Sequence, residues 1–144
     1  MNRRDFFVSS LAAAVAASLA GNRALAASSA AVPAEIEATT GAGTRVTLGR
    51  SDIEALRSSL RGALLLPGQP GYDEARRVLN ASIDKHPALV VQPTGTADVR
   101  TAVSFARQHG LLLAVKCGGH SYAGKSTCDG GLQIDLSRMR AVRV

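Results

Sequence analysis

Residues 111–136, with the sequence LLLAVKCGGHSYAGKSTCDGGLQIDL, determine how the chain is interpreted. An apolar run at 111–115 precedes a glycine-rich segment at 117–126, the glycine loop, which contains one histidine, His120. A second apolar stretch follows at 132–136. A short apolar run that ends on consecutive glycines is typical of a buried strand that leads into a tight ligand-binding loop. We therefore expect a strand, a binding loop and a second strand.

The glycine loop has the features of a phosphate site. Gly118 and Gly119 lack a Cβ, so their backbone N–H groups can approach an anion closely. Ser121 and Ser126 can donate hydroxyl hydrogen bonds to phosphate oxygens, although serines in such loops more often bond the local backbone. The sequence thus predicts a loop for a phosphate or pyrophosphate, and two motifs compete for the same residues.

The first motif is the phosphate loop of nucleotide triphosphatases. Residues 119–126, GHSYAGKS, match its pattern letter for letter, but the pattern requires a helix directly after it. Gly130 and Gly131 would together cost about 2 kcal/mol in a helix interior. Residues 132–136 instead alternate apolar and polar side chains, as a half-buried strand does. We interpret the match as accidental and keep a P-loop-type nucleotide binder as the alternative function.

The second motif is a set of short pieces in a fixed order between residues 72 and 144. They are YDEAR at 72–76, Asn80, PALVVQP at 87–93, DV at 98–99, VSFA at 103–106, GGHS at 118–121, Gly124, Ser126 and GLQIDLS at 131–137. In order and spacing they resemble the FAD-linked oxidases of the vanillyl-alcohol oxidase / p-cresol methylhydroxylase (PCMH-type) family. The berberine-bridge-enzyme-like branch is the most similar.

The resemblance implies an α+β fold, namely the first lobe of a PCMH-type FAD-binding domain. This lobe would consist of a β-α-β unit with flanking helices, and the domain would be incomplete. The resemblance also implies an FAD whose pyrophosphate is held by Gly118, Gly119, His120, Ser121, Gly124 and Ser126. In that family the histidine at the position of His120 bonds covalently to the 8α-methyl of the flavin. A neutral imidazole is a competent nucleophile, since its free pKa is about 6.5. Position alone would favour a histidine that only hydrogen-bonds within its loop.

The resemblance implies an oxidoreductase activity, in which a hydride passes from a substrate C–H to the flavin. Oxygen would then reoxidise the flavin. Relatives act on sugars, alcohols and secondary metabolites, and no residue here selects among them. The second FAD-contacting lobe, the substrate-binding sheet and the catalytic base are expected beyond Val144. Because so small a core holds a dinucleotide poorly, we expect the chain alone to bind FAD weakly or not at all and to be inactive.

Residues 1–26 have the order of parts of a twin-arginine export signal, which would place the protein in the periplasm or outside the cell. Arg3 and Arg4 precede an apolar run at 8–20, and ALA at 24–26 supplies a cleavage pattern. The run is shorter than the roughly 20 residues that cross a bilayer, so we expect no stable membrane anchor. The twin-arginine machinery, an expected partner, exports folded proteins, which suits a cofactor inserted in the cytoplasm.

The rest divides into an N-terminal arm with helices, 27–84, and the FAD-binding part, 85–144. Residues 27–45 lack periodicity and predict a flexible arm. A capping box from Ser51 to Glu54 predicts the start of a short helix, with Ile53, Leu56 and Leu60 on one face and Gly62 closing it. A second helix is expected at 72–80.

Residues 88–116 predict a β-α-β unit with parallel strands. Its strands are expected at 88–92 and 111–116, and Thr96 caps a helix that runs to His109, with Val99, Ala102, Val103 and Ala106 on one face. This arrangement brings the glycine loop to the carboxyl end of its strand, where ligands of such sheets bind. His86 and His109 are expected at the surface.

The formal charge of +6 is scattered and lacks interleaved aromatics, which make up 3% of the chain. This pattern indicates a solvated surface and no nucleic-acid face.

The two cysteines, Cys117 and Cys128, allow two further hypotheses. With His120 they supply three soft ligands for an open zinc site in an exported metal-binding domain, but the paired-cysteine spacing of structural zinc sites is absent. A disulfide between them is possible in an oxidised compartment. We interpret Cys117 first as a small buried hydrophobe, second as a disulfide partner and last as a metal ligand, so that no metal is expected.

Overall fold

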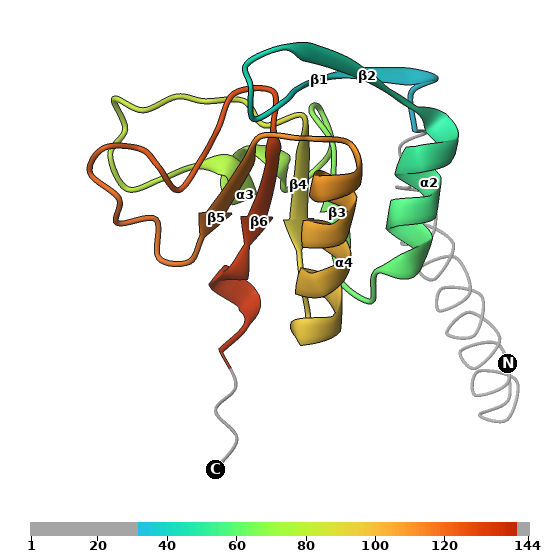
Figure 1. Cartoon of the computed structure of the whole chain (residues 1–144). Coiled ribbons are helices and arrows are strands. Elements are labelled where there is room, and N and C mark those ends of the chain that lie inside the picture. Colours follow the sequence, from blue (N-terminus) through green and yellow to red (C-terminus); the bar gives the residue numbers. More distant parts are fainter. Residues whose placement is uncertain (1–31, 141–144) are drawn as a thin grey trace, which may run out of the picture. The chain divides into compact units, whose positions relative to one another are not determined.

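A computed structural model describes residues 32–140 of the chain (Figure 1). The export signal expected at residues 1–26 lies outside the described residues. Within them, a two-stranded hairpin accompanies a four-stranded mixed sheet with helices on both of its faces. No helix among residues 32–140 is long and apolar enough to span a membrane.

The four-stranded sheet has the order β3-β4-β6-β5. Strands β4 (Leu89–Gln92), β6 (Leu132–Asp135) and β5 (Leu113–Lys116) are parallel, and β3 (Ala63–Leu65) pairs antiparallel with β4. The predicted β-α-β unit and its parallel strands are confirmed, but β6 lies between its two strands. Strand β3, in a leucine run closed by Pro67, was not predicted.

Strand β6 is buried on both faces, so the expectation of a half-buried strand is wrong. Gln133 and Asp135 are as inaccessible as Leu132 and Ile134. The alternation of polar and apolar residues holds, but the polar side chains face a second packed layer and not water. A central strand between two covered faces has no solvent side on which to place them.

Helix α4 (Thr96–Gln108) covers one face of the sheet through Ala102 and Ala106, which are buried. Val103, expected on the same face, is 42% exposed. Thr96 is not the cap: Gly95 is the N-cap, and Thr96 is the first helical residue.

Asp98 in the first turn of α4 joins this helix to the chain segment that follows α2. Its carboxylate accepts hydrogen bonds from the N–H groups of Arg61, Gly62 and Thr94 at 2.9–3.0 Å, and from the Thr94 hydroxyl. Burial by itself would raise the pKa of Asp98, but these donors outweigh it and lower the pKa. No sequence pattern indicated this contact.

Helix α2 (Arg50–Ser59) packs beside α4, with Ile53 and Leu56 buried as predicted. The capping box is displaced from the predicted position. Gly49 is the N-cap, and its N–H donates to Asp52 Oδ2 at 3.2 Å, so that Asp52 and not Glu54 closes the turn. Helix α2 ends at Ser59, before Gly62.

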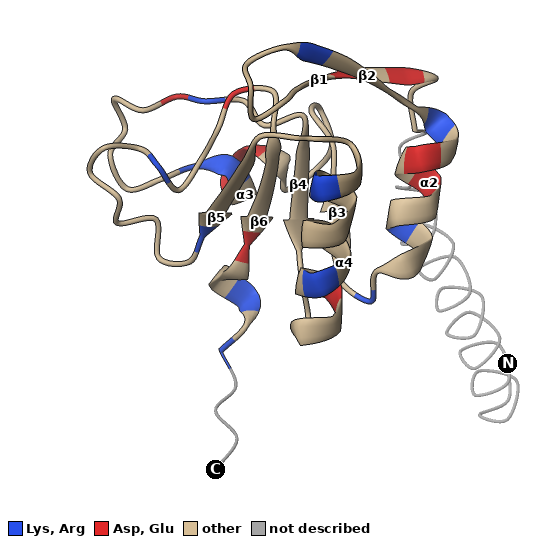
Figure 2. Ribbon diagram, viewed as in Figure 1, with Lys and Arg blue, Asp and Glu red and all other residues tan. Residues whose placement is uncertain are grey.

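The expected flexible arm at 27–45 is wrong for its described part. Strands β1 (Glu35–Thr39) and β2 (Arg45–Gly49) form an antiparallel hairpin, with acidic side chains on β1 and a basic one on β2 (Figure 2). Thr39 joins β1 to the sheet's loops, since its N–H donates to Gly130 O and its carbonyl accepts from Leu112 N. The alternation of polar and apolar residues in these two strands was too short, and the turn at 40–44 too irregular, to be recognised from the sequence.

The opposite face of the sheet is covered by α3 (Tyr72–Arg76), which is shorter than the predicted helix at 72–80. Tyr72 and Ala75 pack there against Val90 of β4, whereas Val91 faces α4. A short 3-10 helix, η1 (Leu136–Arg138), follows β6. Between α3 and β4 the chain has no regular structure and runs beside the loop between β5 and β6 (Figure 1).

Candidate functional site

The glycine loop begins at the carboxyl end of β5 and returns to β6 without a helix. Lys125 and Ser126 lie in a turn, residues 127–131 are irregular, and β6 starts at Leu132. The prediction that no helix follows the loop is confirmed. A phosphate loop needs that helix, because its amino-terminal N–H groups and dipole hold the phosphates. The nucleotide-triphosphatase alternative is therefore not supported.

The N–H groups of residues 118–123 form a continuous row of unused donors. None of them donates to an acceptor within residues 32–140, whereas Gly124 N binds Ser121 O at 3.0 Å and Lys125 N binds Ser121 Oγ at 3.0 Å. A backbone N–H without a partner is costly unless water or a ligand accepts it. Consecutive N–H groups in a tight turn are a recognised type of anion-binding concavity.

Three carbonyl oxygens of the loop point toward residues 78–86, which we name the supporting segment. Gly119 O accepts from Leu79 N at 3.0 Å and Tyr122 O from Asn80 Nδ2 at 3.3 Å. Gly124 O accepts from Lys85 Nζ at 3.5 Å, a long contact. The loop therefore has a carbonyl side in contact with protein and an N–H side that is free.

Two glycines are required where the loop rests on this segment. Gly119 has φ +70° and Gly124 has φ +68°, a region that side chains with a Cβ rarely adopt. A Cβ on Gly119 would lie 3.4 Å from the Val78 backbone, and one on Gly124 would lie 2.7 Å from Ile83 Cγ2. Both positions thus combine a left-handed backbone with close packing.

His120 lies at the surface of the loop, with its imidazole against the bare face of Gly118. A Cβ on Gly118 would come within 2.5 Å of His120 Cδ2 and 2.8 Å of Nε2, so glycine leaves room for the ring. The residue is exposed, and neither ring nitrogen bonds another residue in the described part of the chain. The ring is therefore available to a ligand that approaches from the N–H side.

The two serines of the predicted site differ in their surroundings. Ser121 is half-buried, and its hydroxyl oxygen accepts from Lys125 N, which is the local role that serines in glycine loops usually have. Ser126 is buried, and its side chain has no bond to a described residue. The loop thus brings together the predicted residues from Gly118 to Gly124, with Ser126 at its far end.

The first interpretation of Cys117, as a buried hydrophobe, is wrong. Cys117 is exposed and Cys128 is buried, and both are free thiols, so they form no disulfide. Burial raises the pKa of Cys128 to about 11. Among residues 32–140, no three His, Cys, Asp or Glu side chains gather as metal ligands would. His86 is exposed as predicted, and the ring of the half-buried His109 lies 4.4 Å from that of Phe105.

A buried polar row lies at the carboxyl ends of the parallel strands, next to the start of the loop. Lys116 Nζ is 3.4 Å from Asp135 Oδ1, with side chains 8% and 1% exposed. Gln92 Nε2 donates to Asp135 Oδ2 at 2.9 Å, and Lys116 Nζ also donates to Arg77 O at 3.3 Å. This row was not predicted from the sequence, although a polar residue ends each of the three strands.

Residues 87–144 match a family model described as the FAD binding domain. The chain is 29% identical over 86 residues to (R)-6-hydroxynicotine oxidase of Paenarthrobacter nicotinovorans, covering 60% of this chain and 19% of the relative. It is 34% identical over 96 residues to a chitooligosaccharide oxidase of Gibberella zeae, covering 63% and 20%. Among solved structures, a carbohydrate oxidase from Microdochium nivale aligns with a TM-score of 0.57 at 32% identity, covering 65% and 20%.

Residues 87–144 are therefore similar to the FAD-binding-domain family. The resemblance to PCMH-type, berberine-bridge-enzyme-like FAD-linked oxidases is confirmed, and the α+β unit described above is part of such a domain. The relatives are FAD-linked oxidoreductases. The chain spans about a fifth of the length of the curated relatives that it matches.

Proposed function

We propose that the chain is the part of an FAD-dependent oxidoreductase that binds the cofactor's pyrophosphate. The observation that carries this proposal is the row of N–H groups at residues 118–123, which have no acceptor among the described residues. A diphosphate presents several acceptor oxygens close together, which is what such a row can bind. Bound FAD would supply the capacity to accept a hydride from a substrate C–H.

In this proposal each part of the loop has a distinct task. The N–H groups of Gly118, Gly119, His120 and Ser121 would donate to phosphate oxygens, and the absent Cβ atoms of the glycines would allow close approach. The Ser121 and Ser126 hydroxyl protons are available to add charge-assisted bonds. Gly124 would close the loop over Ile83.

We further propose that His120 tethers the flavin. Its exposed imidazole, free of other bonds in the described part, supports this role, as does its position beside the N–H row. An imidazole nitrogen of His120 would hold the flavin through a covalent bond at its 8α position, and the bound FAD would supply the redox chemistry.

The substrate class proposed for the intact enzyme is a sugar, an alcohol or a secondary metabolite. The relatives are named for a hydroxynicotine, a chitooligosaccharide and a carbohydrate, which supports a small organic substrate and does not choose among them. Oxygen is the proposed second substrate.

The test of this function is to express the gene, denature the product in acid and look for yellow flavin fluorescence that remains with the protein. Loss of that fluorescence in His120→Ala, with non-covalent flavin retained, would assign the tether to His120. Flavin that stays bound after acid in the variant would place the tether elsewhere. A product of the full-length gene that never acquires flavin would contradict the proposal as a whole.

We also propose that the protein is exported by the twin-arginine route to the periplasm or beyond. The support is the order of paired arginines, apolar run and cleavage pattern in residues 1–26. Export in the folded state would let FAD be inserted before translocation.

A further inference from the structure

Within the described residues, every hydrogen bond between the supporting segment and the glycine loop ends on a carbonyl oxygen of the loop, at Gly119, Tyr122 or Gly124. We propose that this segment, held in place by Arg76, turns the loop's N–H groups outward, so that Arg76 and Asn80 are positioning residues for the diphosphate. The inference rests on the proposed function, because it explains how the N–H row comes to face a ligand. Neither residue belongs to the loop itself.

Peptide geometry couples the direction of each carbonyl to that of the N–H group that follows it. In a trans peptide the C=O of one residue and the N–H of the next point in opposite directions. Leu79 N holds Gly119 O toward the supporting segment, so the N–H of His120 points away from it. Asn80 Nδ2 holds Tyr122 O in the same way, which turns the N–H of Ala123 outward. The donors of the segment thereby set the direction of the loop's own donors.

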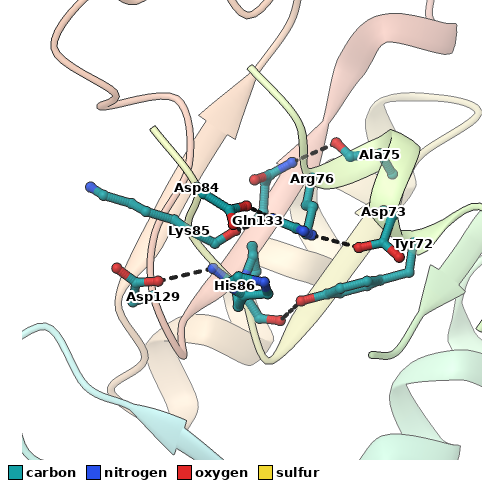
Figure 3. A network of polar contacts seen from close by, with 10 residues as sticks. Tyr72, Asp73, Ala75, Arg76, Asp84, Lys85, His86, Asp129 and Gln133 are labelled. Atoms are coloured by element: carbon teal, nitrogen blue, oxygen red, sulfur yellow. Dashed lines mark hydrogen bonds and ion pairs between the residues drawn. The ribbon is translucent and has the colours of Figure 1, made fainter. Parts of the chain in front are cut away.

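The supporting segment has no regular secondary structure, and Arg76 holds it in place. Figure 3 shows Arg76 of α3 reaching across to it: Nε donates to Asp73 Oδ1 at 2.8 Å, and Nη1 donates to Asp84 Oδ1 and, at 3.0 Å, to Lys85 O. The Arg76 side chain is 12% exposed, so its guanidinium is largely enclosed. One side chain thus joins the helix to two residues at the far end of the segment.

Helix α3 is itself anchored to the rest of the fold. Without this anchoring, Arg76 would move together with the supporting segment. Gln133 Nε2 of β6 donates to Ala75 O at 2.9 Å, and Tyr72 OH donates to Pro87 O at 2.6 Å (Figure 3). Burial raises the pKa of Tyr72 to about 12, so its hydroxyl remains a donor at neutral pH. The helix is therefore attached to the sheet core on one side and to the start of β4 on the other.

The far end of the segment is joined to the returning part of the chain between β5 and β6. His86 N donates to Asp129 Oδ1 at 2.9 Å, and Gly130 N donates to His86 O at 2.8 Å. Arg76 is therefore linked through Asp84 and Lys85 to the end of the segment that holds Asp129 and Gly130, which follow the glycine loop. A shift of the segment would release the loop carbonyls that it now holds.

Two variants separate positioning from simple electrostatic attraction. Arg76→Lys keeps the positive charge but loses the planar group that spans Asp73, Asp84 and Lys85 O. Asp84→Ala makes the chain more positive and removes an exposed ion-pair partner of Arg76. Attraction alone predicts unchanged anion affinity in the first and tighter binding in the second, whereas positioning predicts weaker binding in both. Matched controls are Arg45→Lys and Glu37→Ala, which alter the exposed Arg45–Glu37 pair on the hairpin.

The experiment titrates inorganic pyrophosphate into the 15N-labelled chain and follows the amide shifts of residues 118–123. We expect the dissociation constant to rise about tenfold in Arg76→Lys, equivalent to about 1.4 kcal/mol, and to rise in Asp84→Ala, with both controls unchanged or slightly tighter. Unchanged affinity in Arg76→Lys, or tighter binding in Asp84→Ala, would overturn the positioning role.

Hydrogen exchange without any ligand provides the second readout. The Leu79 amide bonds Gly119 O and the His86 amide bonds Asp129 Oδ1. Both amides should exchange faster in Arg76→Lys and in Asp84→Ala. The Leu132 amide, which bonds Leu112 O, should not change and so shows that the fold is intact. Unchanged exchange at Leu79 and His86 would refute the inference. A wild-type chain that shows no pyrophosphate effect would refute the proposed function, and the exchange rates alone would then decide the role of Arg76.

Discussion

Gly124 lies directly over Ile83, and a Cβ at Gly124 would come within 2.7 Å of Ile83 Cγ2. The two residues belong to different segments, the glycine loop and the supporting segment, and their contact forms part of the boundary between them. Gly124 also has φ +68°, so its backbone and its surroundings both require the absence of a side chain.

Gly124→Ala should therefore lower the free energy of unfolding by about 1–3 kcal/mol, through left-handed strain and overpacking. Urea denaturation measures the change. In an Ile83→Ala background the overpacking term should disappear and only the φ penalty should remain. Equal losses in both backgrounds would show that Ile83 does not restrict this position.

The buried Lys116–Asp135 pair predicts a large loss of stability when one partner is removed. Lys116→Met should cost about 3–5 kcal/mol, because it leaves the Asp135 carboxylate with a buried charge and without its counter-ion. The double variant Lys116→Met/Asp135→Leu should recover much of that loss. A single variant as stable as the wild type would mean that Gln92 and Ser137, which also donate to Asp135, are sufficient.

Asp98 predicts a pH dependence of folding. Its pKa in the folded chain is lowered, so the folded state binds this proton less readily than the unfolded state, in which the pKa is about 3.9. The stabilisation is thus complete above about pH 4 to 5 and decreases as the pH falls through the folded-state pKa. Urea unfolding between pH 2.5 and 7 measures it, and Asp98→Asn should show a shallower acid loss than the wild type. Parallel curves would contradict the assignment.

The two thiols should differ sharply in reactivity. Only the thiolate attacks alkylating reagents, Cys117 is exposed, and burial raises the pKa of Cys128 to about 11. At pH 8 a maleimide or iodoacetamide should modify Cys117 at least about 100-fold faster than Cys128. Mass spectrometry after a timed quench identifies the site, and Cys117→Ser should leave the folded chain almost unlabelled. Rapid labelling of that variant would show that Cys128 is accessible.

The proposed export route predicts that Arg3 and Arg4 are needed together. Replacing both by lysine keeps the charge of the leader but removes the paired guanidinium groups. We expect the double variant, fused to a folded reporter, to remain in the cytoplasm, whereas lysine substitution at Arg23 should not alter export. Cell fractionation measures the distribution. Export of the double variant at the wild-type level would contradict the twin-arginine assignment.

Local patterns were sufficient for much of the fold. The apolar runs on either side of α4 predicted β4 and β5, and the glycines at 130 and 131 correctly excluded a helix after the loop. The glycines at 118 and 119 identified the loop itself. These local patterns were sufficient because strand length, helix periodicity and glycine conformation depend on residues within a few positions of one another.

Errors arose where distant segments decide the outcome. The described part of residues 27–45 was predicted to be a flexible arm because nothing local shows that Thr39 bonds Leu112 and Gly130. Gln133 and Asp135 read as a solvent face because the sequence does not show that α3 covers Gln133 or that Lys116 and Gln92 meet Asp135. Cys117 read as buried although the loop projects it outward.

Short-range sequence patterns were enough to predict the order of strands, helix and glycine loop, and they carried the family resemblance that led to FAD. The side on which the loop presents its N–H groups could be known only from the folded chain, because that direction depends on donors from Leu79 and Asn80. These residues lie about forty positions earlier in the chain, beyond the reach of any local pattern. The peptide group then transmits their effect, since holding each carbonyl inward turns the following N–H toward the ligand.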